Sequence, residues 1–303
     1  MSGEVHGGRR AGGGTVFFVS DYGSRDEFVG VVHAVIRRLA PEVRVIDLSH
    51  EVPPFAVRSG AELLVRAAPH LGEGAVLGVV DPGVGGSRRG VALGVGSDAG
   101  PGLLVGPDNG LLPPAADALG GVVAAVVLPR PAQEGTAPGP AGPSATFDGR
   151  DVFAPAVAAW CRGAPLDDLG EPADPAGLVR LPPPVQEIGA RPGGGAYLRS
   201  EVTWIDRFGN VQLATGAADV PELVLPAAAA DSSMARRREA LLAIPRAEGP
   251  RHRVQLVRTF GDIDEGRLGL LVDANGRLAL ACRQASAADV LGARPGDHVV
   301  VEW

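Results

Sequence analysis

The chain contains no lysine. Its 28 Lys and Arg residues are therefore all arginine, and they stand against 35 acidic residues, which leaves a net charge of −7. Schiff-base catalysis and the phosphate-binding loop of P-loop NTPases both need a lysine, so those two chemistries are excluded. An acidic chain without a run of basic residues also fits nucleic acid or an anionic membrane surface poorly, and we expect neither as a partner.

Cysteines and long apolar runs are scarce as well. Cys161 and Cys282 are the only two cysteines and lie far apart in unrelated sequence, so we expect neither a disulfide framework nor a cysteine-based metal site. This cysteine usage fits a reducing cytoplasm. No stretch approaches the roughly 18 apolar residues of a membrane span. Residues 1–14 are rich in Gly and Arg without an apolar core, and we expect them to form a disordered lead-in.

Potential metal ligands are not clustered along the sequence. Asp81, Asp108 and Asp148 lie in three separate segments, and no His-x-x-x-His pair or Cys/His cluster is present. We therefore predict no metal site and no redox cofactor.

The order of apolar patterns predicts an α/β fold. Strand-like runs alternate with helical spacing over residues 15–185, and the helical spacing is clearest over residues 28–39 and 58–70. This alternation is typical of a mostly parallel sheet flanked by helices. Between Leu128 and Thr146 lies a Pro- and Gly-rich stretch that sustains neither helix nor strand. It fits a mobile loop leading into a site and a plain linker equally well.

The character of the chain changes after two Pro- and Gly-rich breaks, at residues 182–184 and 191–195. From residue 195 to residue 303 short strand-like runs dominate, and the Asn275-Gly276 pair predicts a hairpin turn. We therefore predict an α/β domain over residues 15–185 and a smaller β domain over residues 195–303.

Several strand-like runs of the first domain end in polar residues. The apolar run before Asp81 stops abruptly and turns through glycines toward Arg88, and other runs stop at Asp21, at Ser49-His50 and at Asp108-Asn109. The carboxyl ends of parallel strands meet at one edge of a sheet, which is where doubly wound folds bind ligands. These polar groups therefore predict a site at that edge.

Six segments carry a family resemblance and follow one another in family order along nearly the whole chain. They are Ser20-Asp-Tyr-Gly23, Ile46-Asp-Leu-Ser-His-Glu-Val-Pro-Pro-Phe55, Asp81-Pro-Gly-Val-Gly85 with Arg88, Gly106-Pro-Asp-Asn-Gly-Leu-Leu112, Thr146-Phe-Asp-Gly-Arg-Asp-Val-Phe-Ala-Pro155, and Ile205-Asp-Arg-Phe-Gly-Asn210. On these segments the chain resembles the S-adenosyl-L-methionine (SAM) hydroxide adenosyltransferase family, which shares its fold with the SAM-dependent fluorinase and chlorinase. The resemblance implies that the C-terminal domain is a compact β-barrel. It also implies a homotrimer in which each site lies between one subunit's first domain and a neighbour's second domain.

With SAM as the substrate, the electrophile is C5′ of the ribose and the leaving group is methionine. Methionine departs as a neutral thioether, so no acid is needed to protonate it. The protein must instead hold the substrate and an in-line nucleophile in a desolvated pocket, and such positioning contributes roughly 7–11 kcal/mol in favourable cases.

The resemblance and the residue types together predict the substrate-binding residues. By resemblance Asp21 accepts both ribose hydroxyls, while Asn210 offers the donor and acceptor that an adenine edge requires and Asp26 suits the methionine ammonium group. The full set is Asp21, Asp26, Phe55, Phe147, Gly149, Asp206, Phe208 and Asn210. Plainer roles remain open: an acid in the first turn of a helix for Asp26, core positions for Phe147 and Phe208, and ordinary turns at Asp21 and Asp206.

The identity of the nucleophile depends on Asp81. By resemblance, the halogenating enzymes carry a tyrosine at this position and the hydroxide-transferring enzymes an aspartate. An ionised Asp81 would repel a halide about 4 Å away by roughly 4 kcal/mol at an effective dielectric of 20. Arg88 matches the family's arginine, whose charge would keep Asp81 ionised. Water is therefore the expected nucleophile.

The chain departs from the family at one catalytic position. The family completes an Asp-Arg-His triad with the His of a Phe-His-Gly-Arg-Asp motif, and this chain has Asp148 in place of that His. Three accounts of this difference are open. In the first, Asp148 replaces the His as the hydrogen-bond acceptor for the water; in the second, Asp81 and Arg88 suffice and the protein is a slower hydrolase. In the third, the site binds SAM without turning it over. We expect hydrolysis of SAM to adenosine and L-methionine, with Asp81, Arg88 and Asp148 as catalytic residues. A SAM- or adenosine-binding protein and a SAM-dependent halogenase are the alternatives.

Overall fold

The chain divides into two units after Leu181, and each is described by itself. The computed structural model describes residues 14–97, 99–130, 145–224, 239–244 and 251–303. The expected lead-in, apart from Gly14, and residues 131–144 of the predicted loop therefore lie outside the described residues. Within the described ranges, no helix has the length and hydropathy needed to cross a membrane.

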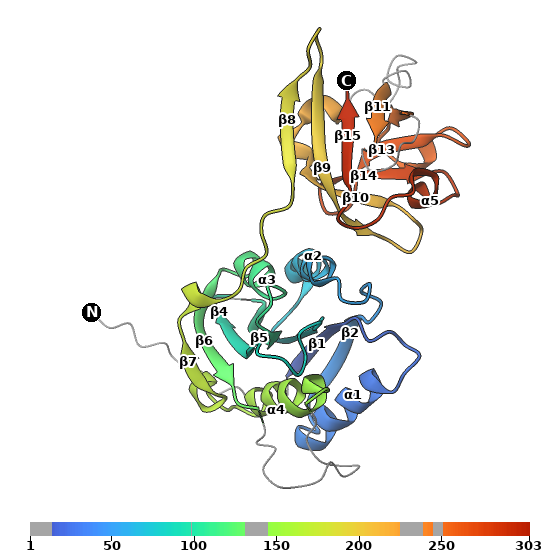
Figure 1. Ribbon diagram of the computed structural model, residues 1–303. Helices are drawn as coiled ribbons and strands as arrows, with labels where there is room; N and C mark the ends of the chain where they lie inside the picture. The colour runs from blue at the N-terminus through green and yellow to red at the C-terminus, as the bar shows by residue number, and fades with distance from the viewer. Residues whose placement is uncertain (1–13, 98, 131–144, 225–238, 245–250) are drawn as a thin grey trace. The chain divides into compact units, whose positions relative to one another are not determined.

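The first unit is built on a sheet with the strand order β2-β1-β3-β5-β4-β6-β7 (Figure 1). Its strands are β1 (Thr15–Ser20), β2 (Arg44–Ser49), β3 (Gly74–Val79), β4 (Gly90–Val95), β5 (Pro101–Pro107), β6 (Val122–Leu128) and β7 (Glu171–Ala173). The pairs β2–β1, β1–β3 and β3–β5 are parallel, whereas β4 and β7 run antiparallel to their neighbours. Strands β2, β1, β3, β5 and β6 thus point the same way, which confirms the predicted mostly parallel sheet.

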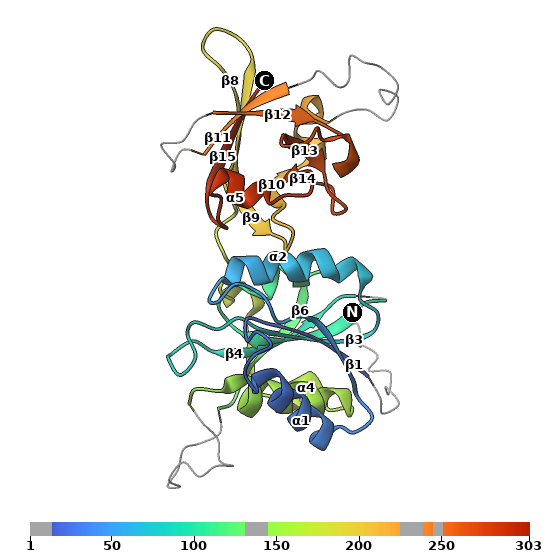
Figure 2. The ribbon, with the colours of Figure 1, turned by 90° about the vertical axis from the view of Figure 1, so that its right-hand side faces the viewer.

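Helices cover both faces of this sheet (Figures 1 and 2). α1 (Phe28–Leu39) and α4 (Ala154–Cys161) pack on one face, and α2 (Val57–Ala67) and α3 (Pro113–Ala118) pack on the other. Both predicted helical stretches are confirmed, the second continuing as a 3₁₀ turn at Ala68–His70. A π-helical turn (Gly149–Phe153) precedes α4, and short 3₁₀ turns span Leu166–Asp168 and Pro175–Gly177.

Side chains of β1 show how the sheet is buried on both sides. Val16 and Phe18 belong to the core under α1 and α4, whereas Phe17 and Val19 belong to the core under α2 and α3. This alternation follows from the two-residue period of a strand. Because both faces are covered, polar side chains can reach solvent or a ligand only at the ends of the strands.

Strand direction brings several distant segments to one edge of the sheet. β1, β3, β5 and β6 end at this edge, and the antiparallel β4 begins there, since Gly90 pairs with both Pro107 and Leu128. The residues just beyond these strand ends include Asp21, Asp81, Asp108 and Arg130, with Arg88 just before β4. This is the edge at which the sequence predicted a site.

The second unit is a closed barrel, which confirms the predicted barrel-like domain. Its strands are β8 (Gln186–Ala190), β9 (Ala196–Ile205), β10 (Val211–Gly216), β11 (Glu239–Ala243), β12 (His252–Leu256), β13 (Leu268–Val272), β14 (Arg277–Cys282) and β15 (His298–Glu302). The ring runs β9-β10-β14-β13-β12-β11-β15 and closes back on β9, while β8 pairs with β9 outside the ring. α5 (Ala287–Leu291) and 3₁₀ turns at Ala217–Asp219, Pro221–Leu223 and Phe260–Asp262 complete the unit.

Two turns of the second unit bear on the sequence predictions. The predicted hairpin at Asn275-Gly276 joins β13 to β14, where Val272 pairs with Leu278. The Gly-rich residues 191–195, expected as part of a domain boundary, instead form the turn of the β8–β9 hairpin, in which the Arg191 N–H donates to the Gly195 carbonyl at 3.0 Å. Composition alone does not separate a glycine-rich linker from a glycine-rich hairpin turn.

Candidate active site

The guanidinium of Arg88 lies between two carboxylates. Its Nε donates to Asp81 Oδ1 at 2.8 Å, and its Nη2 donates to Asp81 Oδ2 and, at 2.6 Å, to Asp148 Oδ2. A β-carbon at Gly83 would lie 2.9 Å from Arg88 Cγ, so the glycine lets the turn fold the arginine back over Asp81. The fold therefore brings together all three residues predicted to be catalytic.

Burial makes this arrangement strongly electrostatic. The side chains of Asp81, Arg88 and Asp148 are 6%, 10% and 3% exposed. Burial alone would lower the pKa of Arg88, but the hydrogen bonds and charges of Asp81 and Asp148 outweigh it and raise that pKa above its ordinary value. Arg88 therefore remains a cation and fixes both carboxylates, while the ring of Phe153 lies 5.2 Å from its Cζ.

One donor of this cation has no partner among the residues that the structure describes. Arg88 Nη1 is buried and makes no hydrogen bond to the described residues. Leaving a buried N–H unpaired costs about 1–3 kcal/mol. Nη1 is therefore a donor suited to an oxygen atom of a bound molecule.

A second arginine holds Asp148 from the other side. Arg130 Nη2 lies 3.2 Å from Asp148 Oδ2, and Arg130 also donates to the carbonyls of Gly86 and Arg88, at 2.7 and 3.2 Å. Arg130 follows β6, so it reaches this edge for the same topological reason as Asp81. The four side chains form a chain of alternating charge, Asp81–Arg88–Asp148–Arg130.

Asp21 lies at the end of the neighbouring strand β1. Its Oδ2 accepts a hydrogen bond from the Phe55 N–H at 2.9 Å. Phe55 has a positive φ of 67°, and the residue is 72% exposed. Burial raises the pKa of Asp21 and outweighs the backbone hydrogen bonds that lower it, and the charge of Asp81 raises it further. Asp21 is therefore close enough to Asp81 to feel its charge, and it also holds Phe55 in a backbone conformation that is uncommon for a residue other than glycine.

An aromatic cluster lines the same region. The ring centroids of Tyr22, Phe28 and Phe147 lie 5.2 to 5.8 Å from one another. A β-carbon at Gly149 would lie 2.2 Å from Tyr22 Oη, so a glycine is needed for the tyrosine to pack there. Burial raises the pKa of Tyr22, and the charges of Asp21, Asp81 and Asp148 raise it further, so its hydroxyl stays neutral. Of the predicted binding residues, Phe147 and Gly149 thus belong to one packed cluster.

Three predicted binding residues lie in the second unit, on the turn between β9 and β10. Asp206 Oδ1 accepts hydrogen bonds from the N–H groups of Phe208 and Asn210, both at 2.9 Å, and Asp206 Oδ2 accepts one from Asn210 Nδ2 at 2.8 Å. Phe208 is 72% exposed. Asp206 thus stabilises the turn, and the turn presents an aromatic ring to the surface.

Other polar positions of the first unit take different places. Asp26 is exposed, in the segment before α1. Asp108 is buried against Arg89, whose Nε donates to it at 2.9 Å, and it accepts the Val179 N–H at 2.8 Å. Asn109 Nδ2 donates to the Val80 carbonyl at 2.8 Å. Asp108 and Asn109 therefore connect chain segments and are not part of the Asp81 network.

Sequence reasoning missed Tyr22 and Arg130. Each follows closely on a strand that ends at the site edge, which is the signal that singled out Asp21 and Asp81. Tyr22 directly follows Asp21, so the strand end that singled out Asp21 also pointed to Tyr22. The position of Arg130 depends instead on the pairing of β6 with the antiparallel β4.

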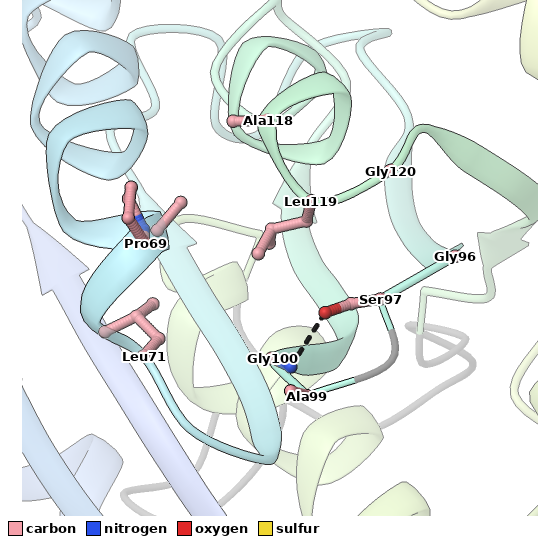
Figure 3. A pocket seen from close by; sticks show the side chains of 10 residues that line it. Pro69, Leu71, Gly96, Ser97, Ala99, Gly100, Ala118, Leu119 and Gly120 are labelled. Atoms are coloured by element: carbon pink, nitrogen blue, oxygen red, sulfur yellow. Dashed lines mark hydrogen bonds between the residues drawn. The ribbon is translucent and has the colours of Figure 1, made fainter.

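A hollow at the opposite edge of the sheet shows how the two edges differ (Figure 3). It has a volume of about 360 Å³ and lies where β4 ends and β5 begins. Its lining includes Pro69, Leu71 and Leu119, and Ser97 Oγ accepts the Gly100 N–H at 2.8 Å. No ionisable side chain is among the described residues that line it, so it offers none of the chemistry found at the first edge.

One group of potential metal ligands lies within the described part of the chain. It comprises His33, Asp47 and His50 and contains none of the residues that the sequence predicted for the site.

Comparison with known proteins finds family matches in both units. Residues 16–170 match the SAM hydroxide adenosyltransferase N-terminal domain, and residues 200–300 match the C-terminal domain. A protein of Salinispora tropica named (R)-S-adenosyl-L-methionine hydrolase is 45% identical over 94% of this chain and 97% of its own length. A fluorinase of an Actinoplanes species is 28% identical over 65% of this chain and 70% of its own.

Among solved structures, the crystal structure of an uncharacterized conserved protein from Thermotoga maritima superposes with a TM-score of 0.76 at 28% identity, covering 94% of this chain and 99% of that one. The two domain matches together span most of the chain in family order. The chain therefore belongs to the SAM hydroxide adenosyltransferase family.

Proposed function

We propose that this protein hydrolyses SAM. A water oxygen forms a bond to C5′ of the ribose, the C5′–S bond breaks, and its electron pair stays on sulfur, so the products are adenosine, L-methionine and a proton. The observation that carries this proposal is the buried Asp81–Arg88–Asp148 network at the carboxyl edge of the sheet. Relatives named as hydrolases at 38–45% identity support the same reaction.

The charges of the network favour water over a halide. Arg88 is engaged by two carboxylates, so its charge is already neutralised. A halide about 4 Å from Asp81 would be repelled by roughly 4 kcal/mol at an effective dielectric of 20. Water can donate hydrogen bonds to carboxylate oxygens and accept one from Arg88 Nη1. Asp81 thus orients the nucleophile and Arg88 fixes Asp81.

Asp148 takes the role of the family His in this proposal. It occupies the matching motif position and is joined to Asp81 through Arg88, with Arg130 as a second partner. A carboxylate held in place can accept a proton from an attacking water, as a general base does. The other two accounts, turnover by Asp81 and Arg88 alone and binding without turnover, predict different behaviour of Asp148 variants.

The proposed substrate contacts come from both units of the chain. In the first unit we propose Asp21 for the ribose hydroxyls, Phe55, Phe147 and Gly149 for the walls of the pocket, and Asp26 for the methionine ammonium group. In the second unit we propose that Phe208 packs against adenine while the Asp206–Asn210 turn presents a polar edge to it. Asn210 keeps an amide oxygen for this, since its Nδ2 already donates to Asp206.

We also propose the assembly and location that the resemblance and the cysteine usage suggest. The resemblance implies a homotrimer in which each site is formed by the first unit of one subunit and the second unit of a neighbour. Light scattering at several concentrations measures that state directly. We place the trimer in the cytoplasm.

Product analysis with an Asp81 variant tests the proposed reaction. The full-length protein is incubated with SAM, with and without excess chloride, and the products are separated by chromatography. The sulfonium is a stereocentre and the relatives' name specifies the (R) form, so each epimer is assayed separately. We expect equal amounts of adenosine and methionine whether or not chloride is present. Asp81→Asn removes the charge with little change of shape and should lower the rate by about 100-fold or more.

The control is Asp108→Asn, which alters another buried aspartate–arginine pair at the same edge and should leave turnover of the folded protein nearly unchanged. Formation of 5′-chloro-5′-deoxyadenosine would instead make the protein a halogenase. Intact SAM recovered from a tight complex would make it a binding protein.

Variants of Asp148 test its role as the replacement for the family His. Asp148→Asn removes the proton acceptor and should lower kcat by about 10²–10⁴-fold. Asp148→His restores the family residue and should be the faster of the two variants, with kcat falling below about pH 6.5 as the imidazole gains a proton. Steady-state kcat is measured against pH for all three proteins. A wild-type rate in Asp148→Asn would show that Asp81 and Arg88 suffice.

The pH dependence of kcat/KM tests the role of Asp21. Only the ionised carboxylate accepts hydrogen bonds from both ribose hydroxyls, so kcat/KM should fall as the pH drops through the pKa of this group. Burial raises that pKa above 3.8, so the loss should begin at a higher pH than for an exposed aspartate. Asp21→Asn should be slower throughout and should lack this acidic limb. An acidic limb that persists in Asp21→Asn would belong to another group.

A further inference from the structure

Two histidines and a carboxylate from separate segments converge beside the sheet. His33 lies on α1, Asp47 on β2, and His50 just after β2. Asp47 pairs with Phe18 across the β1–β2 ladder, and Phe18 contacts both histidine rings, with centroids 6.1 Å from His33 and 4.6 Å from His50. The cluster therefore has a buried aromatic floor, and no role in the Asp81 network accounts for it.

The ligand atoms lie near the spacing of a metal site. His33 Nε2 lies 2.8 Å from Asp47 Oδ1, and His50 Nε2 lies 3.0 Å from the same oxygen. The three ligand atoms all lie within 4.8 Å of one another. Nitrogen and oxygen ligands about 2.1 Å from a tetrahedral zinc ion are separated by about 3.4 Å. The two nitrogen–oxygen distances are shorter than that by about half an ångström, so a small rotation of the side chains brings the three atoms to ligand spacing.

The environment of His50 suits a cation at its Nε2. This atom is buried and lies 3.0 Å from Asp47 Oδ1, with no other partner among the described residues. His50 Nδ1 lies 2.7 Å from the buried Ser20 Oγ. In the tautomer that donates Nδ1–H to this hydroxyl, Nε2 presents a lone pair toward a carboxylate oxygen. A hydrogen bond at the far ring nitrogen is what orients metal-binding histidines in general.

Access and donor chemistry narrow the choice of ion. The side chains of His33 and Asp47 are 35% and 42% exposed, so an ion and its remaining water ligands can reach the cluster. Imidazole nitrogens suit zinc and neighbouring transition metals, whereas calcium and magnesium prefer oxygen donors throughout.

We propose that His33, Asp47 and His50 bind one divalent transition-metal ion of the zinc class, which ties α1 to the end of β2. Through the His50–Ser20 contact the ion also braces the end of β1, next to Asp21. The site is separate from the Asp81–Arg88–Asp148 network and does not depend on the function proposed for that network. It revises the sequence prediction of no metal, because that prediction considered spacing along the chain and these ligands come together only in the fold.

Zinc titration of the full-length protein tests this site. After dialysis against EDTA, Zn²⁺ binding is measured by isothermal calorimetry and the thermal unfolding midpoint is measured with and without Zn²⁺. We expect one saturable site per chain and a raised unfolding midpoint. His33→Asn and Asp47→Asn should each weaken the affinity by about 100-fold or more, since even outer-shell changes cost 10- to 100-fold.

His70→Asn is the matched control, because His70 is exposed at the end of the segment after α2 and lies outside the cluster. It should bind Zn²⁺ like the wild type. Circular dichroism checks that each variant is folded. If Asp47→Asn unfolds, the Zn²⁺ affinity of His33→Asn tests the site, because His33 is only partly buried. Absence of saturable Zn²⁺ binding, or wild-type affinity in His33→Asn, would overturn the proposal. It would show that only hydrogen bonds connect these side chains.

Discussion

The charge of Arg88 is the constraint on which the site depends. Two aspartates buried to this degree at one sheet edge would repel each other and lose their hydration. The guanidinium of Arg88 bonds to both, and Arg130 is the second partner of Asp148. Removing one partner of a buried pair costs about 3–5 kcal/mol, because an uncompensated charge remains. The turn at Gly83, the π-helical turn that follows Asp148, and the ring of Phe153 all place groups around this one cation.

Strand direction explains why such distant residues meet. Asp148 is 60 positions from Arg88 along the chain, yet both lie at the edge where β3 ends and the antiparallel β4 begins. Arg130 arrives at the end of β6. The same edge carries the Arg89–Asp108 pair, which shares no residue with the Asp81–Arg88–Asp148 network. The aromatic cluster of Tyr22, Phe28 and Phe147 lies next to Gly149, the residue after Asp148.

Local sequence patterns predicted the strand ends and the helices, but not the contacts between distant segments. An apolar run that stops at Asp21 or Asp81 is enough to place those residues at strand ends, and helical spacing located α1 and α2. Arg88 and Asp148 came from the motif resemblance, but the shared guanidinium hydrogen bond did not, since it depends on how β4 pairs. Arg130 and the His33–Asp47–His50 cluster depend in the same way on contacts between distant segments. The turn at residues 191–195 was misassigned because glycine-rich linkers and hairpins share a composition.

Hydrolysis in water enriched in oxygen-18 shows whether solvent water is the nucleophile that attacks C5′ at the Asp81–Arg88–Asp148 network. SAM is turned over by the wild-type protein in labelled water, and adenosine and methionine are analysed by mass spectrometry. We expect one labelled oxygen in each adenosine, at the 5′ position, and none in methionine. Adenosine without the label would mean that its 5′ oxygen does not come from solvent water, which would contradict the role assigned to the network.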